Sequence, residues 1–352
     1  MSLSSARTEA EVFRSREVHL PNFPSFKPPR ELRGGHRMSI RGVGWNSDGR
    51  RLASCGADKL VRIWTPERSV DHRASTELRG HTESVEQLAW DPIQPDILAT
   101  AGGDRTVRLW DIRVAKAIHT VNTPGSNINI AFHPKGGYVA VGDKVDNVSI
   151  IDTSKGQIVQ TLKDGNVDKE EINEICWSPD GSLFLLTTGA GTVHIHDAMQ
   201  EAGGVYREVM KSENDAAPPA NSKWERLHTI VAHTANVFCI EFDPLSRFVA
   251  TASSDSMVGL WDTQEWMSVR MSGALNFPAR SLSFSHDGEF LAAGGEDNWI
   301  DISSTATGNT VHKLSIPGMI NTLSWHPSKT MLAYAGDEKD VKDQGIIRVF
   351  GL

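Results

Sequence analysis

Three sets of His, Ser or Thr, Asp and Trp residues recur along the chain, and the first three residue types are those that a hydrolase uses for nucleophilic catalysis. The sets are His36, Ser54, Asp58 and Trp64; His81, Thr100, Asp104 and Trp110; and His233, Thr251, Asp255 and Trp261. In each set the hydroxyl residue precedes the Asp by 4 positions, and the Asp precedes the Trp by 6. One such constellation is enough for an enzyme, whereas an array of similar units needs one in each unit. The threefold copy favours a structural role and predicts that the protein is not an enzyme.

The four side chains of each set, which we call a tetrad, are suited to a buried hydrogen-bonded brace. A buried indole N–H needs an acceptor, a hydroxyl both donates and accepts, and a buried carboxylate is tolerated only when it is hydrogen-bonded. We expect His and the hydroxyl to join the Trp of an outer strand to the Asp of a tight turn. Four other units lack the full tetrad and carry Ile151, His196, Ser303 and Phe350 at the Trp position.

Seven aromatic residues, each followed by a polar turn, mark repeating units of about 42 residues. They are Trp45, Trp90, Phe132, Trp177, Phe242, Phe284 and Trp325. Within the second unit, short runs at 85–90, 97–101, 106–110 and 117–121 are rich in β-branched and aromatic residues and are separated by Gly, Pro and Asp, which is typical of strands and turns. Seven units of four strands predict an all-β fold, a seven-bladed β-propeller. Its Gly-His pairs and Trp-Asp pairs resemble those of WD repeats.

The two ends of the chain are expected to share the last blade. Residues 346–350 have the pattern of a third strand with no fourth strand after it, and residues 28–33 precede the first Gly-His pair as residues 76–80 precede the second. An N-terminal strand should therefore complete blade 7 and remove exposed strand edges. We expect a flexible N-terminal arm at residues 1–26, in which residues 8–18 form one or two helical turns when a partner is present, and a propeller over residues 27–352. A longer interval in blade 4 predicts an insertion at residues 199–222.

Composition and motifs limit the kinds of ligand. The net charge of −8 argues against a general nucleic-acid binder, and no apolar run is long enough to cross a membrane. No phosphate-binding loop or nucleophile elbow is present, so we expect no cofactor and no small-molecule substrate. His194 and His196 face the same way on a predicted strand, but no third ligand is evident, so no metal site is expected.

Acidic residues in turns of the last two blades are candidates for binding a basic partner. They are Glu296, Asp297, Asp337 and Glu338, on the same face as the tetrad Asp turns. If these carboxylates border a central pocket, the protein would be an adaptor that captures a short basic peptide, such as a histone tail or a degradation signal.

The irregular blades 3 and 6 carry a more specific resemblance. Residues 120–130, 138–142 and 149–152 of blade 3, and 280–288, 295–297 and 300–302 of blade 6, resemble the family of THO complex subunit 3. The general WD pattern does not require these residues, and the resemblance extends through all seven repeats. It implies a non-catalytic scaffold in the nucleus, docked onto the large helical THO subunits of the transcription–export complex. That complex couples transcription and mRNA processing to mRNA export, and contact with mRNA is expected to be indirect, through the complex.

Overall fold

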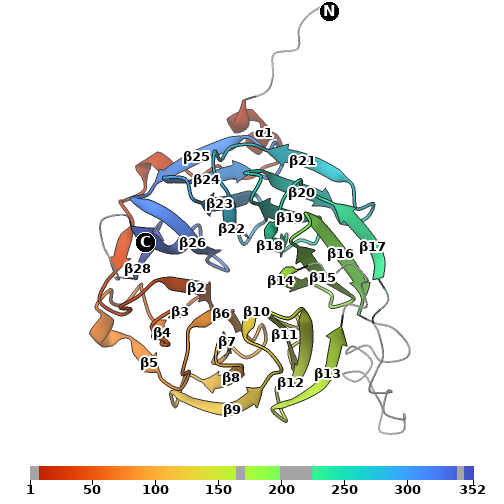
Figure 1. Cartoon of the computed structure of the whole chain (residues 1–352). Helices are drawn as coiled ribbons and strands as arrows, with labels where there is room; N and C mark the ends of the chain where they lie inside the picture. The colour runs from red at the N-terminus through yellow and green to blue at the C-terminus, as the bar shows by residue number, and fades with distance from the viewer. Residues whose placement is uncertain (1–7, 164–170, 199–223, 225, 339–344) are drawn as a thin grey trace, which may run out of the picture.

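The computed structural model of the chain describes residues 8–163, 171–198, 224, 226–338 and 345–352. These residues form seven four-stranded antiparallel sheets, arranged as blades around a central axis (Figure 1). The all-β, seven-bladed propeller predicted from the repeat spacing is confirmed.

Each blade pairs its strands in chain order from the axis outward, except for the last blade. The strands of blades 1 to 3 are β2 (Ile40–Trp45), β3 (Leu52–Gly56), β4 (Val61–Trp64) and β5 (Thr76–Leu78); β6 (Val85–Trp90), β7 (Ile97–Gly102), β8 (Thr106–Asp111) and β9 (Lys116–Asn122); and β10 (Asn127–Phe132), β11 (Tyr138–Asp143), β12 (Asn147–Asp152) and β13 (Gln157–Lys163). The strands of blades 4 to 6 are β14 (Ile172–Trp177), β15 (Leu183–Thr188), β16 (Thr192–Asp197) and β17 (Arg226–Val231); β18 (Val237–Phe242), β19 (Phe248–Ser253), β20 (Val258–Asp262) and β21 (Ser268–Ser272); and β22 (Ala279–Phe284), β23 (Phe290–Gly295), β24 (Trp299–Ser304) and β25 (Thr310–Ser315).

Blade 7 is closed by the start of the chain, as predicted. Its strands are β26 (Gly318–Trp325), β27 (Leu332–Glu338), β28 (Ile346–Phe350) and the N-terminal β1 (Arg30–Leu32). β1 pairs antiparallel with β28, with Glu31 opposite Arg348, and the Arg348 guanidinium donates to the Glu31 carboxylate at 2.9 Å. Both ends of the propeller are thus held in one sheet, and β28 has no unpaired edge.

The burial of each strand follows from its place in the blade. The second strands, such as β3 and β11, are buried at every position because neighbouring blades cover both of their faces. The fourth strands, such as β9, alternate between exposed and partly buried residues because they lie at the rim. In all seven blades the pairing of the first strand with the second shifts register once, near the start of the first strand. Every innermost strand therefore bends in the same way around the axis.

The N-terminal segment differs from the flexible arm expected at residues 1–26. From Thr8 onward it is described and packs on the propeller without any partner, through α1 (Glu9–Ser15) and the short 3₁₀ helix η1 (Phe23–Ser25). Phe13 and Phe23 are 1% and 2% exposed, and the Phe13 ring stacks on Phe290 of blade 6 with centroids 5.4 Å apart. Because most residues of the segment are polar, its composition did not reveal these aromatic residues. Their burial offsets the entropy lost when the segment is ordered.

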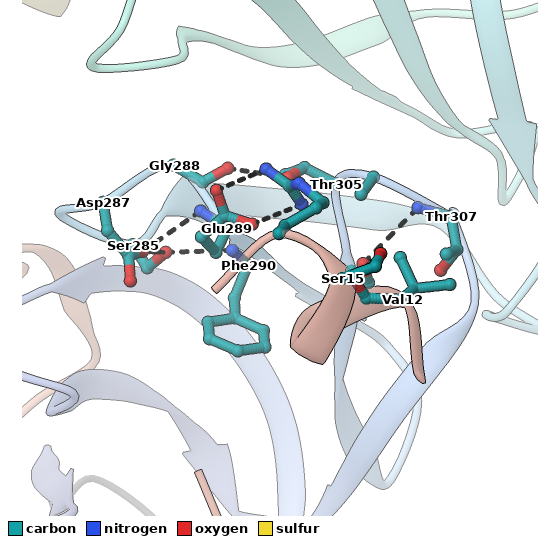
Figure 2. Close-up of polar contacts among 12 residues, drawn as sticks. Val12, Ser15, Ser285, Asp287, Gly288, Glu289, Phe290, Thr305 and Thr307 are labelled. Atoms are coloured by element: carbon teal, nitrogen blue, oxygen red, sulfur yellow. Dashed lines mark hydrogen bonds and ion pairs between the residues drawn. The ribbon is translucent and has the colours of Figure 1, made fainter. Parts of the chain in front are cut away.

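A two-pronged ion pair also fixes the N-terminal segment. The Arg16 guanidinium donates to both oxygens of Glu289 at 2.7 Å, and Glu289 is almost fully buried. Figure 2 shows the helix that carries Val12 and Ser15 beside the turn from Ser285 to Phe290. The planar fork of arginine matches a carboxylate, so the pair adds direction to the aromatic packing.

Two further sequence predictions concern the insertion in blade 4 and segments that cross a membrane. The insertion predicted at 199–222 lies outside them, between β16 and β17, the third and fourth strands of blade 4. Within the described part of the chain, no helix is long and apolar enough to cross a membrane.

Candidate functional site

The structure brings the residues of each tetrad together in one hydrogen-bonded chain. In blade 2 the Trp110 indole N–H donates to Thr100 Oγ1 at 2.9 Å, Thr100 Oγ1 lies 2.8 Å from His81 Nε2, and His81 Nδ1 lies 3.1 Å from the Asp104 carboxylate. The same order joins the other two sets, with Trp-to-hydroxyl distances of 2.8 and 2.9 Å. Each tetrad therefore connects the third strand, the second strand and the tight turn of one blade.

The tetrad carboxylates also hold the loop that enters their blade. Asp104 accepts the N–H of Thr82 at 2.8 Å, and Asp58 accepts that of Arg37 at 3.0 Å. Burial opposes the charge on Asp104, but the donated N–H of Thr82, the Thr106 hydroxyl and His81 outweigh it and hold its pKa below the ordinary value. Burial lowers the pKa of His81, against the attraction of Asp104. A neutral His that donates to a charged Asp follows, which is a brace and not an exposed nucleophile system.

Two of the blades without a tetrad fill its place with other aromatic rings. In blade 4 the Trp224 ring packs edge-on against Trp177 and Phe184, with centroids 5.5 and 5.2 Å away. In blade 7 the ring of Phe350, which stands at the Trp position, lies 5.2 Å from Phe26 and 6.4 Å from Phe23 of the N-terminal segment. The described N-terminal segment is therefore part of the packing of blade 7.

A central channel of about 480 Å³ runs between the innermost strands of all seven blades, which surround the axis in Figure 1. Its lining includes two carboxylates that the sequence reasoning missed, Glu174 of β14 and Glu241 of β18. The Gln87 amide donates to Glu174 at 2.7 Å across the channel, and Glu241 accepts the Ser283 hydroxyl and the Phe284 N–H at 3.3 Å. Aligning the repeats on their aromatic anchors would have placed both acids in the first strands, which line the axis.

Both channel carboxyls hold their protons more strongly than usual. Burial raises the pKa of Glu174 to about 7 and that of Glu241 to about 8, although each accepts hydrogen bonds that favour the charged form. At neutral pH the channel therefore carries less negative charge than its acidic residues suggest. The Glu86 carboxylate at the same lining lies 3.8 Å from Arg41.

The four acidic residues predicted for partner binding are each engaged within the chain, and the channel lining does not include them. Asp297 is 1% exposed and accepts the N–H groups of Asn276 and Phe277, so it holds the entry loop of blade 6 and is not presented to a partner. Glu296 pairs with Arg280 at 2.6 Å. The other two contacts are Asp337 with Ser39 and Asn321, and Glu338 with Arg348.

The sequence reasoning missed the structural role of Asp297. It stands at the position of the tetrad Asp, but blade 6 has neither the His nor the Trp that would have identified the position. A turn carboxylate with two N–H donors is a structural feature even without its tetrad.

The rim of blades 4 and 5 presents apolar side chains to solvent. Leu227 and Val231 of β17 are exposed, as are Met267, Val269 and Met271 at and next to β21. Exposed apolar side chains on outer strands are candidates for protein contact.

No metal centre is evident in the part of the chain that the structure describes, where no group of three His, Cys, Asp or Glu side chains is placed to hold an ion. His194 and His196 lie on β16 with ring centroids 6.4 Å apart. The three cysteines are free thiols.

Comparison with known proteins shows the family of the chain. A model of the family described as THOC3 beta-propeller domain matches residues 36–335. The chain is 40% identical over 321 residues to THO complex subunit 3 of Arabidopsis thaliana, which covers 90% of this chain and 93% of that protein. It is 31% identical over 335 residues to WD repeat-containing protein AAC3 of Dictyostelium discoideum, covering 90% of this chain and 66% of that protein. A more distant match, 24% over 318 residues, is Protein tipD of Dictyostelium discoideum, covering 87% and 47%.

Proposed function

The chain belongs to the THOC3 β-propeller family, and on that premise we propose that it is a non-catalytic scaffold subunit of a nuclear THO complex. In this role it acts through protein contacts in coupling transcription and mRNA processing to mRNA export. The observation that carries the proposal is the match to THO complex subunit 3 of Arabidopsis thaliana, which extends over 90% of this chain and 93% of its relative. A likeness over nearly the whole of both chains supports a shared assembly more strongly than a shared fold does.

The rim of blades 4 and 5 supports the scaffold role. Its exposed residues, which we call the rim patch, are Leu227, Val231, Met267, Val269 and Met271. An apolar surface of this kind suits an apolar helix face of a larger subunit, because burying it removes the area from water. Both strands of the rim patch are paired along one edge with the third strand of their blade, so little ordering entropy opposes binding.

The test of the proposal is recovery of a THO complex by the tagged full-length chain. Tagged protein is isolated from nuclear extract at moderate salt with RNase added, and the retained proteins are identified by mass spectrometry. The other THO subunits should be retained, because the contacts are between proteins and do not need RNA. Retention of histones or ubiquitin-ligase components in their place would contradict the proposal and favour the basic-peptide adaptor.

A matched pair of variants places the contact on the propeller. Val269→Asp combined with Met271→Asp puts two charges into the rim patch and should reduce recovery of the other subunits at least about tenfold. Ile118→Asp, at an exposed position of β9 in blade 2, is the control and should leave recovery unchanged. Equal recovery with both would exclude the rim patch while leaving membership of the complex intact.

A further inference from the structure

Three blades carry an arginine at the same position of their third strand. Arg62 of blade 1, Arg108 of blade 2 and Arg348 of blade 7 each stand opposite the second-strand residue at the position of the tetrad hydroxyl. On its other side, each arginine pairs with one residue of the outermost strand of its blade. Directly paired residues of neighbouring strands project to the same side of a sheet, so this outer residue is placed to neutralise the guanidinium.

In blades 1 and 7 the outer residue is a glutamate, and the arginine is neutralised. The Arg62 guanidinium donates to Glu77 and, at 2.9 Å, to the Ser75 hydroxyl. The Arg348 guanidinium donates to Glu31 at 2.9 Å. The side chains of these two arginines are only 11% and 13% exposed, and a charge so far from water needs an opposite charge beside it. The two blades therefore show which group this position accepts.

Blade 2 keeps the arginine but lacks the carboxylate. Thr120 stands opposite Arg108, where the other two blades have a glutamate, and it is exposed. Within the described part of the chain, Arg108 forms no ion pair and no hydrogen bond, and its Nε is buried without a partner. Its guanidinium carbon lies over the Trp110 ring, 5.9 Å from the centroid. The neutralising group of blades 1 and 7 is thus missing from blade 2.

Two acidic residues of adjoining elements are engaged with other groups. Glu77 of the preceding blade uses its two carboxylate oxygens for two arginines other than Arg108. Asp104 of the tetrad turn is held by His81 and by the N–H of Thr82. Burial lowers the pKa of His81 and Asp104 raises it, and the positive charge of Arg108 adds to the lowering. That effect is typical of a guanidinium whose charge is not neutralised.

The Arg108 guanidinium is positioned before any ligand arrives. It packs directly against the loop that enters blade 2, since a Cβ at Gly80 would lie only 2.6 Å from Arg108 Nη1. On the outer strand, the side chain of Thr120 is shorter than that of a glutamate, so the place of the carboxylate is left to solvent. A planar donor held in this way loses little entropy when it binds a carboxylate.

We propose that Arg108 of blade 2 binds the carboxylate of an aspartate or glutamate side chain from a partner protein. The carboxylate takes the place that Glu77 has in blade 1 and Glu31 has in blade 7, and it accepts from the terminal nitrogens of the guanidinium. A single carboxylate suits the site better than a chain of phosphates, because the net charge of −8 repels polyanions. The contact lies in a different blade from the rim patch and does not depend on the proposed scaffold role.

The first experiment supplies the missing carboxylate from the chain itself. Thr120→Glu should raise the midpoint of thermal unfolding by about 1–2 °C over Thr120→Gln, which has the same length but no charge. When each is combined with Arg108→Gln, the two variants should unfold at the same temperature. Because Thr120 is exposed, neither change disturbs the interior. Equal midpoints for Thr120→Glu and Thr120→Gln alone would show that the guanidinium is not placed to take a carboxylate, and would overturn the proposal.

The second experiment follows ligand binding by NMR on the purified full-length chain at low salt. The probes are Nα-acetyl-glutamate N-methylamide, the corresponding glutamine compound and inorganic phosphate. The amide signal of Gly80 should shift at least about threefold more with the capped glutamate than with the capped glutamine at the same concentration. The signal of Gly35, which lies beside the already neutralised Arg62, is the control and should not shift, and Thr120→Glu should remove the response of Gly80.

Three outcomes of the titration would contradict a carboxylate site. An equal response of Gly80 to the two capped amino acids would show that charge is not recognised. A larger response to phosphate would assign the site to a different anion. Equal shifts at Gly80 and Gly35 would show that the probe binds any arginine of the surface.

Discussion

Blades 2 and 6 have the same strand pairing, but different side chains fill the space between their strands and their entry loop. In blade 2, Leu98 pairs with Trp110 and Thr100 with Arg108; in blade 6 the same register pairs Leu291 with Ser303 and Ala293 with Asp301. Blade 2 fills the space between its strands and its entry loop with a complete tetrad, and blade 6 fills it with small side chains, a buried acid and a pocket. The backbone of a blade is therefore set by strand pairing and by packing between blades, and the tetrad adds stability to a geometry that does not depend on it.

The other irregular blades show how the tetrad can be replaced. Blade 4 uses Trp224, and blade 7 uses Phe350 together with Phe23 and Phe26 from the start of the chain. Both substitutes are aromatic, as the tetrad Trp is, and both draw on segments outside the regular four strands. In blade 6 the carboxylate of Asp301 lines the small pocket that is left.

The largest expected difference between blades 2 and 6 is at the turn carboxylate. Asp104→Ala removes the partner of buried His81 and the acceptor of the Thr82 N–H, and we expect a loss of about 3 kcal/mol in unfolding free energy. Asp297→Ala removes only the acceptor of two backbone N–H groups and should cost about 1–2 kcal/mol. Denaturant unfolding of both variants measures the difference. Equal losses would show that the tetrad His contributes nothing to the brace.

A substitution in the N-terminal segment tests whether buried aromatic rings stabilise blade 7 in place of a tetrad. Phe23→Ala takes away a buried ring that contacts both Phe290 and Phe350, and we expect a loss of about 2–3 kcal/mol in unfolding free energy. The result is read by thermal unfolding of the full chain. Phe277→Ala, at an exposed ring, is the matched control and should change little. If Phe23→Ala unfolds like the unaltered chain, the segment is not part of the packing of blade 7.

Sequence spacing was enough for the fold and for the tetrads, but not for the irregular interiors. The fixed offsets from His81 to Trp110 report a hydrogen-bonded chain, and such a chain permits few alternatives. Asp297 and Ser303 keep the tetrad spacing, but Leu275 and Ala293 replace the His and the hydroxyl, so the spacing alone did not reveal their roles. The aromatic residues Phe13 and Phe23 were hidden in a polar segment, and their binding site on blades 6 and 7 is assembled only by the fold.

The vacant volume of blade 6 can be filled, which blade 2 does not allow. Ser303→Met adds an unbranched apolar chain to the pocket and should raise the free energy of unfolding by about 1 kcal/mol, since it buries apolar area without displacing a ring. The corresponding change in the full tetrad, Trp110→Met, should be destabilising because Thr100 loses its indole donor and a cavity forms. Thermal unfolding of the two variants checks both signs. A destabilising Ser303→Met would mean that the pocket has no room for the chain.

The tetrads and the channel glutamates also differ in how their contribution to folding stability changes with pH. The lowered pKa of Asp104 and of His81 means that the folded chain binds their protons less readily than the unfolded chain does. Their contribution to stability is complete above the ordinary pKa of His, about 6.5, and is lost as the pH falls. The raised pKa of Glu174 has the opposite effect, because the folded chain keeps a proton that the unfolded chain releases above about pH 4.5.

The smallest expected effect is a pH-dependent change in stability on replacing Glu174. Stability contributed by Glu174 is complete below pH 4.5 and falls as the pH rises to about 7, where its folded pKa lies. Glu174→Gln keeps an acceptor for the Gln87 amide but has no proton to lose, so it should gain about 1 kcal/mol over the unaltered chain at pH 9 and nothing at pH 4.5. That figure is modest because the side chain faces a channel that water enters. Urea unfolding at the two pH values measures it, with Glu86→Gln as the control, since Glu86 lies at the same channel beside Arg41. A gain of equal size at both pH values would show that the introduced amide acts through packing, and the channel would then have no part in the pH response.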